Sequence, residues 1–219
     1  MIRHLIKKDF LLVKKSIVTF LGISIIVPLI VIFLMETSSP IEGIQMIVFL
    51  YMLILLELSF MQAVATEEEK SPKAIALLCA APYSRKEYII SKYACYLIFY
   101  AGCLILYSII AAVYPKLNFL SISEALIVFL AGSLVYGIYT PIALKYGITK
   151  ARTVFTLVIL LISMGPTIIV NVFHPDMHGL LSLLNASSVL TALVFGVLGI
   201  CTFLLSTIVS VKIFIGKEL

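Results

Sequence analysis

Charged residues are scarce in this chain of 219 residues: only 12% are Asp, Glu, Lys or Arg, whereas 62% are hydrophobic. Soluble domains carry about 25% charged residues, and a soluble protein this apolar would expose patches large enough to cause aggregation. The composition therefore excludes an ordinary soluble domain and favours a membrane protein. Basic residues flank apolar runs, so the net charge of +5 suits anionic lipid headgroups and membrane topology better than nucleic acid.

The motifs of catalysis and cofactor binding are also missing. There is no G-x-x-x-x-G-K-[ST] phosphate loop, because Gly216-Lys217 lacks both the earlier glycine and the hydroxyl residue that should follow. The four cysteines show no C-x-x-C spacing and are interpreted as small hydrophobic residues. His174 and His178 lie in a predicted loop beside Pro175, where solvated histidines are commoner than metal ligands. We therefore expect a non-catalytic chain without a cofactor or metal of its own.

Long apolar runs dominate what is present, and a bilayer-spanning helix needs about 20 such residues. We predict an all-α membrane protein with a single domain, 1–219, and six spans, at 16–35, 41–65, 93–114, 122–144, 153–172 and 189–213. Of the 16 Lys and Arg residues, fifteen fall before span 1, after spans 2 and 4, and at the end of span 6. The sixteenth, Lys116, is the one such residue in the loops on the other side of the membrane. Because basic loops remain in the cytoplasm, both termini are predicted to be cytoplasmic.

The first fifteen residues have the pattern of a basic amphipathic helix, which would lie in the cytoplasmic membrane interface before span 1. Asp9 falls in the middle of the apolar arc of this helix, where a carboxylate requires a partner. We predict an ion pair between Asp9 and either Arg85 or Lys92. The alternative, a fraying helix with Asp9 in headgroup water, stays open at this point.

The segment between the second and third spans contains several helix signals. It begins with an acidic cluster, Glu67–Glu69. Ser71-Pro72 can start a short helix, since serine caps helices and proline is favoured at the first helical position, and Pro82 would end it. Ser84 and Glu87 form a capping box that starts a helix running into the third span. The short helix would suit a lever moved by a partner protein; an ordinary ordered loop is the alternative.

Two further features lie within the spans. Glu57 is a carboxylate inside span 2, at a cost of roughly 2.5–3.5 kcal/mol on insertion scales. Either it lines a polar cavity or helix interface and meets a cationic substrate or a hydrogen-bond partner, or it is protonated and bonded to hydroxyls of a neighbouring helix; both interpretations stay open. Ser133 with Gly137, and Ala192 with Gly196, are small-xxx-small pairs that permit close helix contact.

Several of these segments together resemble type-2 ATP-binding-cassette (ABC) exporter permeases. The resemblance is carried by LIKKDF at 5–10, by Glu67-Glu68, by LLCAAPYSRKE at 77–87, and by Lys92-Tyr93 leading into a span. Six spans with both termini inside are also typical of that family, so the resemblance covers essentially the whole chain. Among subgroups, the small size is most similar to bacterial permeases of peptide, bacteriocin and antibiotic-resistance exporters, such as the phenol-soluble modulin exporter.

The resemblance implies a set of partners and a docking site. In that family the loop between spans 2 and 3 forms a coupling helix, here 72–81, which seats in a groove of a separate ATPase that binds ATP and Mg. The residues implied in docking are Glu67, Glu68, Pro72, Leu77, Leu78, Pro82, Ser84 and Arg85. The N-terminal helix with Asp9 resembles the interfacial elbow helix, and 173–188 resembles the short external or re-entrant helices of the family.

As a whole, the resemblance implies the permease subunit of an exporter in a bacterial cell membrane. It would pair with a second permease chain, as a homodimer or heterodimer, and export amphipathic peptides or other hydrophobic compounds. Two alternatives belong to other classes: an ATP-independent transporter or channel, and a membrane anchor or sensor partner without transport. A secondary carrier should show more intramembrane charge and internal repeats than this chain has.

Overall fold

A computed structural model of the chain describes residues 2–36, 44–70, 84–114, 118–147, 150–151, 153, 156–157 and 189–216. Within these residues the main elements are six helices, with no strand, which confirms the all-α class. The helices are α1 (Ile2–Leu12), α2 (Lys14–Glu36), α3 (Ile44–Glu69), α5 (Arg85–Val113), α6 (Ile122–Tyr146) and α9 (Val189–Ile215). The predicted coupling helix at 72–81, most of the predicted fifth span and the 173–188 segment lie outside the described residues.

Four helices are long and apolar enough to cross a membrane by length and composition: α3, α5, α6 and α9. They match the second, third, fourth and sixth predicted spans, with α3 ending later and α5 starting earlier than the apolar runs themselves. Helix α2 covers the first predicted span over 23 residues. An integral membrane protein is therefore supported, and the total of six spans stays a prediction.

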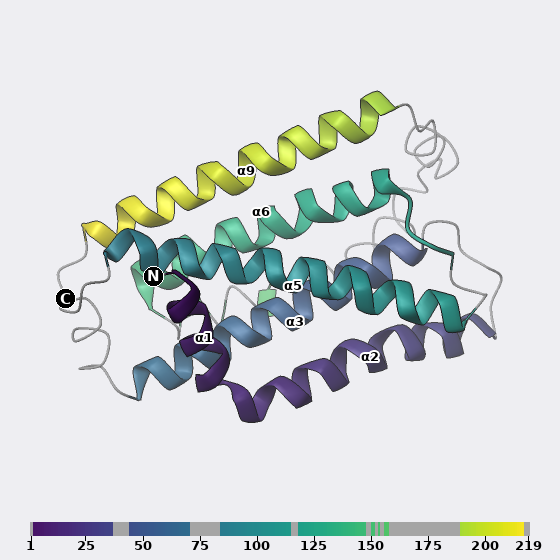
Figure 1. Ribbon diagram of the computed structural model, residues 1–219, viewed down its shortest axis with the longest axis horizontal. Helices are drawn as coiled ribbons and strands as arrows, with labels where there is room; N and C mark the ends of the chain where they lie inside the picture. Colours follow the sequence, from purple (N-terminus) through teal and green to yellow (C-terminus); the bar gives the residue numbers. More distant parts are fainter. Residues whose placement is uncertain are drawn as a thin grey trace.

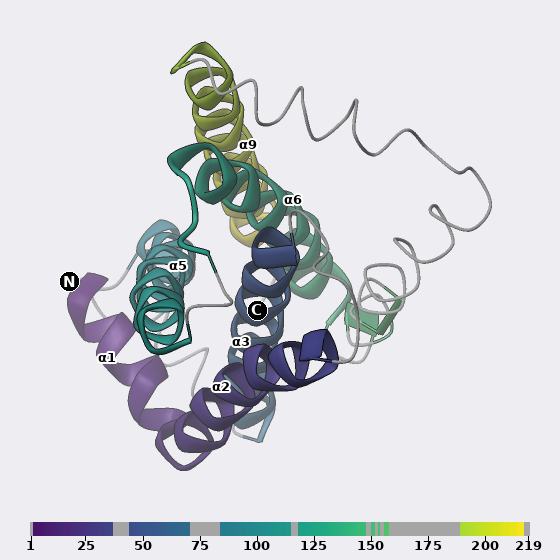
Figure 2. The ribbon, with the colours of Figure 1, turned by 90° about the vertical axis from the view of Figure 1, so that its right-hand side faces the viewer.

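The axes of the five long helices are roughly aligned along the length of the molecule, and α1 crosses one end of them at a steep angle (Figures 1 and 2). At that end lie α1, the start of α2, the end of α3, the start of α5 and the ends of α6 and α9 (Figure 1). Apart from Lys150, the basic residues of the described part of the chain occur in or directly after these segments. The separation of charge seen in the sequence thus becomes one basic end of the bundle, as a positive-inside topology requires.

Helix α3 occupies the centre of the described bundle, against α2, α5 and α6. Its buried side chains, among them Phe49 and Met52, pack with Tyr107 of α5 and Val128 of α6. Helix α9 packs mainly along α6 and is the least buried of the four candidate spans. The bundle therefore has a core around α3 and a peripheral pair of helices, α6 and α9.

The N-terminal segment contains a helix, α1, which ends earlier than the pattern of residues 2–15 indicated; its place in the membrane interface stays a prediction. Helix α1 stops at Leu12, Val13 forms a turn, and Lys14 already belongs to α2. The physical reason is that Val13, only 2% exposed, is anchored against Phe60 and Val64 of α3, so the chain bends around it. Lys14 and Lys15 consequently start the first long helix instead of completing the amphipathic one.

Candidate functional site

Charged side chains from three helices meet at the basic end of the bundle. Helix α1 supplies Lys8 and Asp9, the last turn of α3 supplies Glu68, and α5 supplies Tyr88 and Lys92, which are one helical turn apart. We call these five residues the ion-pair network. It joins the two helices that flank residues 71–83 to the helix that crosses the end of the bundle.

The network balances two cations against two carboxylates. The Lys92 ammonium lies 2.9 Å from Asp9 Oδ2 and 3.3 Å from Glu68 Oε1. The Lys8 ammonium lies 2.7 Å from Glu68 Oε1 and 3.2 Å from Asp9 Oδ1. Tyr88 donates its hydroxyl proton to Glu68 Oε2 at 2.8 Å, and both ammonium groups lie within 5.4 Å of its ring centroid. Each charge therefore has an opposite charge as its neighbour.

Burial makes this balance important. Asp9 is 0% exposed and Lys92 only 4% exposed. The two Asp9 oxygens have ion-pair distances but no hydrogen bond of good geometry within the described residues. Removing one partner of a buried pair leaves an uncompensated charge, at a cost of about 3–5 kcal/mol. The position of α1 is therefore strongly tied to the ends of α3 and α5.

The ion pair predicted for Asp9 is confirmed, and the structure selects Lys92 as its partner on α5. Arg85, the other candidate, instead donates to the backbone carbonyl of Ile215 at the end of α9, at 2.9 Å. Tyr88 also stacks on Phe214 of α9, with ring centroids 5.1 Å apart. The start of α5 is thus joined to α9 as well as to α1 and α3.

The residues that flank the predicted coupling helix are placed as follows. Ser84 caps α5 and forms the predicted capping box with Glu87, whose carboxylate accepts from the Ser84 N–H at 3.0 Å. Glu67 pairs with Lys70 at the surface, whereas Glu68 turns into the network. Pro72, Leu77, Leu78 and Pro82 lie outside the described residues, so their docking role stays a prediction.

Two members of the network, Lys8 and Tyr88, were not expected from the sequence. Tyr88 could have been found from its spacing of four before Lys92, which places both on one face of α5. Lys8 follows the polar pattern of the amphipathic helix and gave no signal that it would turn toward Glu68. Its contribution depends on how α1 is rotated against α3, which only packing determines.

Glu57 lies on α3 at membrane depth, well away from the network. It is 3% exposed, and its Oε1 has no hydrogen-bond partner in the described part of the chain. No cation from the described residues pairs with it. Its two possible roles, in a polar interface or as a protonated structural acid, both stay predictions.

A second polar contact joins α6 to α9 and carries no charge. Ser133 Oγ lies 3.0 Å from Thr202 Oγ1, and Ser206 donates to the Gly137 carbonyl at 3.0 Å. The hydroxyl of Tyr93 on α5 bonds both Ser206 and Ser210, the latter at 2.8 Å. We call this set the hydroxyl seam: Tyr93, Ser133, Gly137, Thr202, Ser206 and Ser210. The close helix contact predicted at Ser133 and Gly137 is thus formed between α6 and α9 of the same chain.

A family model described as "ABC-2 family transporter protein" matches residues 4–215. Neither a curated protein nor a solved structure matches the chain. The match includes all of the described helices except the first two residues of α1, and so it contains every residue of the ion-pair network.

Proposed function

Because this chain belongs to the ABC-2 transporter family and is a membrane permease component of an ABC transporter, we propose that it is driven as an exporter by a separate ATPase docked on its basic end. The family implies an ABC ATPase partner. The contact would be made by residues 72–81 and their flanks, Glu67, Glu68, Ser84 and Arg85. Two permease chains, identical or paralogous, would enclose the transport path.

The ion-pair network is the observation that carries this proposal. In the sequence, residues 71–83 connect the end of α3, which carries Glu68, to the start of α5, which carries Tyr88 and Lys92. Glu68 contacts both Tyr88 and Lys92. A force applied to that segment would act on α3 and α5 through the same side chains that hold α1 by Asp9. Three helices would therefore move together when the ATPase subunits close.

Amphipathic peptides or other hydrophobic compounds are the proposed substrates. The support is the resemblance to peptide and bacteriocin exporters together with the apolar character of the helices that would line the path. A path with few charges suits such compounds, because moving their apolar parts from water to an apolar wall costs little free energy.

The experiment compares two kinds of variant in the permease co-expressed with its cognate ABC ATPase. Leu77→Asp with Leu78→Asp changes the proposed docking face, and we expect it to abolish co-purification of the ATPase. Glu68→Gln removes one charge from the network, where that carboxylate meets Lys8 and Lys92, and leaves residues 72–81 unchanged. We therefore expect the ATPase to remain bound while substrate-stimulated ATP hydrolysis falls. Lys70→Ala, which alters only the exposed pair with Glu67, is the matched control and should change neither.

Two results would contradict the proposal. Retention of the ATPase by the double leucine variant would show that residues 72–81 are not the docking site. Export that continues with a hydrolysis-deficient ATPase would show an ATP-independent transporter instead. Both are measured in the complete complex in membranes, where the native assembly is preserved.

A further inference from the structure

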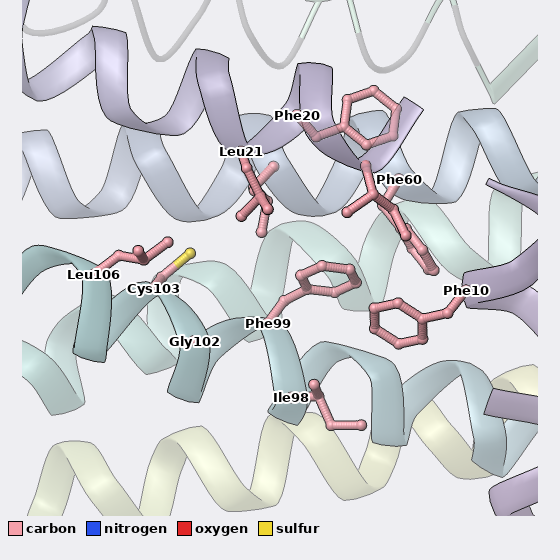
Figure 3. Close-up of a pocket in the computed structure, with 11 residues that line it drawn as sticks. Phe10, Phe20, Leu21, Phe60, Ile98, Phe99, Gly102, Cys103 and Leu106 are labelled. Atoms are coloured by element: carbon pink, nitrogen blue, oxygen red, sulfur yellow. The ribbon is translucent and has the colours of Figure 1, made fainter. Parts of the chain in front are cut away.

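An apolar cavity of about 210 Å³ lies where α1, α2, α3 and α5 meet (Figure 3). Phe10 of α1, Phe60 of α3 and Phe99 of α5 gather at one end, with ring centroids 4.6–5.6 Å apart. Cys103 and Leu106 of α5 lie at the other end (Figure 3). The volume exceeds the roughly 150 Å³ of an engineered apolar cavity that stays dry and binds benzene.

The cavity is open on one side. Two of its lining residues are exposed at the protein surface, Leu21 of α2 at 41% and Ile98 of α5 at 46%. A Cβ added to Gly102, which also lines it, would meet no atom within 4 Å. Since α5 is a candidate membrane span, this opening would face hydrocarbon. Apart from the Cys103 thiol, the side chains that line the wall are all hydrocarbon and would not retain water.

Two lysines lie on the helix faces that line the cavity, one on α2 and one on α1. On α2, Lys14, Ile17 and Leu21 follow at helical spacings of three and four, so the exposed Lys14 shares the face that lines the cavity. On α1, the exposed Lys7 lies three residues before Phe10, which also lines the cavity. Unlike Lys8 and Lys92, neither Lys7 nor Lys14 has an ion pair with a carboxylate in the part of the chain that the structure describes.

We propose that the cavity binds one acyl chain of an anionic phospholipid, whose phosphate is held by Lys7 and Lys14. The lipid would come from the leaflet on the basic side of the bundle, where a headgroup lies level with helix α1. A bound chain would fill the space between α1 and the three long helices and so brace the element that the ion-pair network also holds. This site does not depend on the proposed exporter function.

The absence of tryptophan from the chain allows a direct test. Ile98→Trp places the only indole at the opening of the cavity. The purified full-length chain is reconstituted in phosphatidylcholine bilayers that contain a small fixed fraction of dibrominated lipid, either phosphatidylglycerol or phosphatidylcholine. Bromine quenches indole fluorescence on contact, and we expect clearly stronger quenching by the anionic lipid.

Lysine variants test the headgroup. Each basic residue near an anionic headgroup contributes about a fivefold preference, so Lys7→Gln or Lys14→Gln, made in the Ile98→Trp chain, should lower the preference by about that factor. Lys15→Gln is the matched control, because Lys15 shares the outward face of α2 with Val18, which is 75% exposed. It should leave the preference unchanged.

Glycine variants test the acyl chain. Gly102→Leu fills the cavity without a backbone clash and should abolish the preferential quenching. Gly22→Leu adds the same side chain at a glycine of α2, where an added Cβ would also meet no atom within 4 Å, and it should have no effect. Gel filtration checks folding; if Gly102→Leu aggregates, the two lysine variants, which alter only exposed residues, decide the result.

Four outcomes would overturn the proposal. Equal quenching by both brominated lipids would indicate ordinary annular lipid, and full quenching in Gly102→Leu would place the lipid elsewhere. Loss of quenching as the protein-to-lipid ratio rises would indicate that a second copy of the chain covers the opening. Displacement by an exported compound would indicate a substrate site. No ATPase or nucleotide is present in this assay, so a negative result leaves the proposed function untouched.

Discussion

The ion-pair network and the hydroxyl seam both join helices that are far apart in the sequence, but they use opposite chemistry. The network holds α1 against α3 and α5 with four buried or half-buried charges at the end of the bundle. The seam holds α6 against α9 with neutral hydroxyls and a glycine at membrane depth. Each contact therefore uses the polar groups that its surroundings can tolerate.

The difference matters for movement. Ion pairs in the network are strong but depend on every partner being present, since one lost charge leaves another buried without compensation. Hydrogen bonds in the seam are worth only about 0.6 kcal/mol each on average, so close packing must supply most of the stability there. A perturbation should thus act through charge at the basic end and through volume at the seam.

The largest effect is expected from breaking the network at its most buried cation. Lys92→Met leaves Asp9, which is 0% exposed, with only the longer contact to Lys8, and should lower the free energy of unfolding by about 3–5 kcal/mol. Titration of the purified chain with SDS in mixed micelles measures this value. Lys86→Met, at an exposed lysine of the same helix, is the control and should have little effect.

A double variant separates two contributions to the loss of stability: the lost attraction between Asp9 and Lys92, and the cost of leaving one of them charged and unpaired in the interior. Asp9→Leu combined with Lys92→Met removes both members of the closest pair, and should cost less than the sum of the two single changes. A strictly additive result would mean that Asp9 and Lys92 do not interact.

A smaller effect is expected from added volume at the seam. The Cβ of Gly137→Ala would lie 3.0 Å from both Cβ and Oγ of Ser206. The Ser206 hydroxyl can rotate away, but its Cβ can move only with the backbone of α9. Overpacking of this kind costs about 1–3 kcal/mol. Gly22→Ala has open space around its Cβ and should instead stabilise α2 by about 0.5–1 kcal/mol. If both variants shift the SDS midpoint in the same direction, the seam is not closely packed.

Removing a seam hydroxyl should cost less again. Ser206→Ala deletes the bonds to Tyr93 and to the Gly137 carbonyl, and about 1 kcal/mol is expected, within the range measured for interhelical bonds in membranes. The matched change Ser108→Ala removes only a bond to Leu104 in its own helix, so its unfolding free energy should match that of the wild type. Equal losses in the two variants would remove the case for an interhelical role of Ser206.

The smallest effect is expected at the exposed pair between Glu67 and Lys70. Their side chains are 41% and 63% exposed, so Lys70→Ala should change the unfolding free energy by less than about 0.5 kcal/mol. Added salt should abolish that small difference while leaving the Lys92→Met penalty in place, because buried pairs are screened much less. A salt-sensitive penalty for Lys92→Met would show that water reaches the network.

Local signals in the sequence predicted much of this fold. Long apolar runs identified the five long helices that the structure describes, and the spacing of Ser84 and Glu87 predicted the capping box at the start of α5. The same spacing in Ser121 and Glu124 caps α6 and could have been used in the same way. These features depend on residues three or four apart, so the sequence contains all the information they need.

The candidate site was only partly predictable. Asp9 was identified by its position on an apolar face, but the choice between Arg85 and Lys92 could not be made from a helical wheel. Lys8 and Glu68 are 60 positions apart, and nothing local indicates that they meet. Which charges pair depends on the rotation and tilt of each helix, and those are fixed by packing around α3.

The sequence by itself determined that this chain is helical and apolar, where α5 starts, and that its basic residues collect on one side. Each of these follows from local periodicity or from the cost of placing charge in hydrocarbon. Tertiary structure alone decided that Lys92 neutralises Asp9, that Ser206 bonds across to Gly137, and that a cavity opens beside Gly102. These features form only when separate helices pack against one another. Which buried groups become partners, and which volume stays unfilled, depends on the packing of the whole bundle.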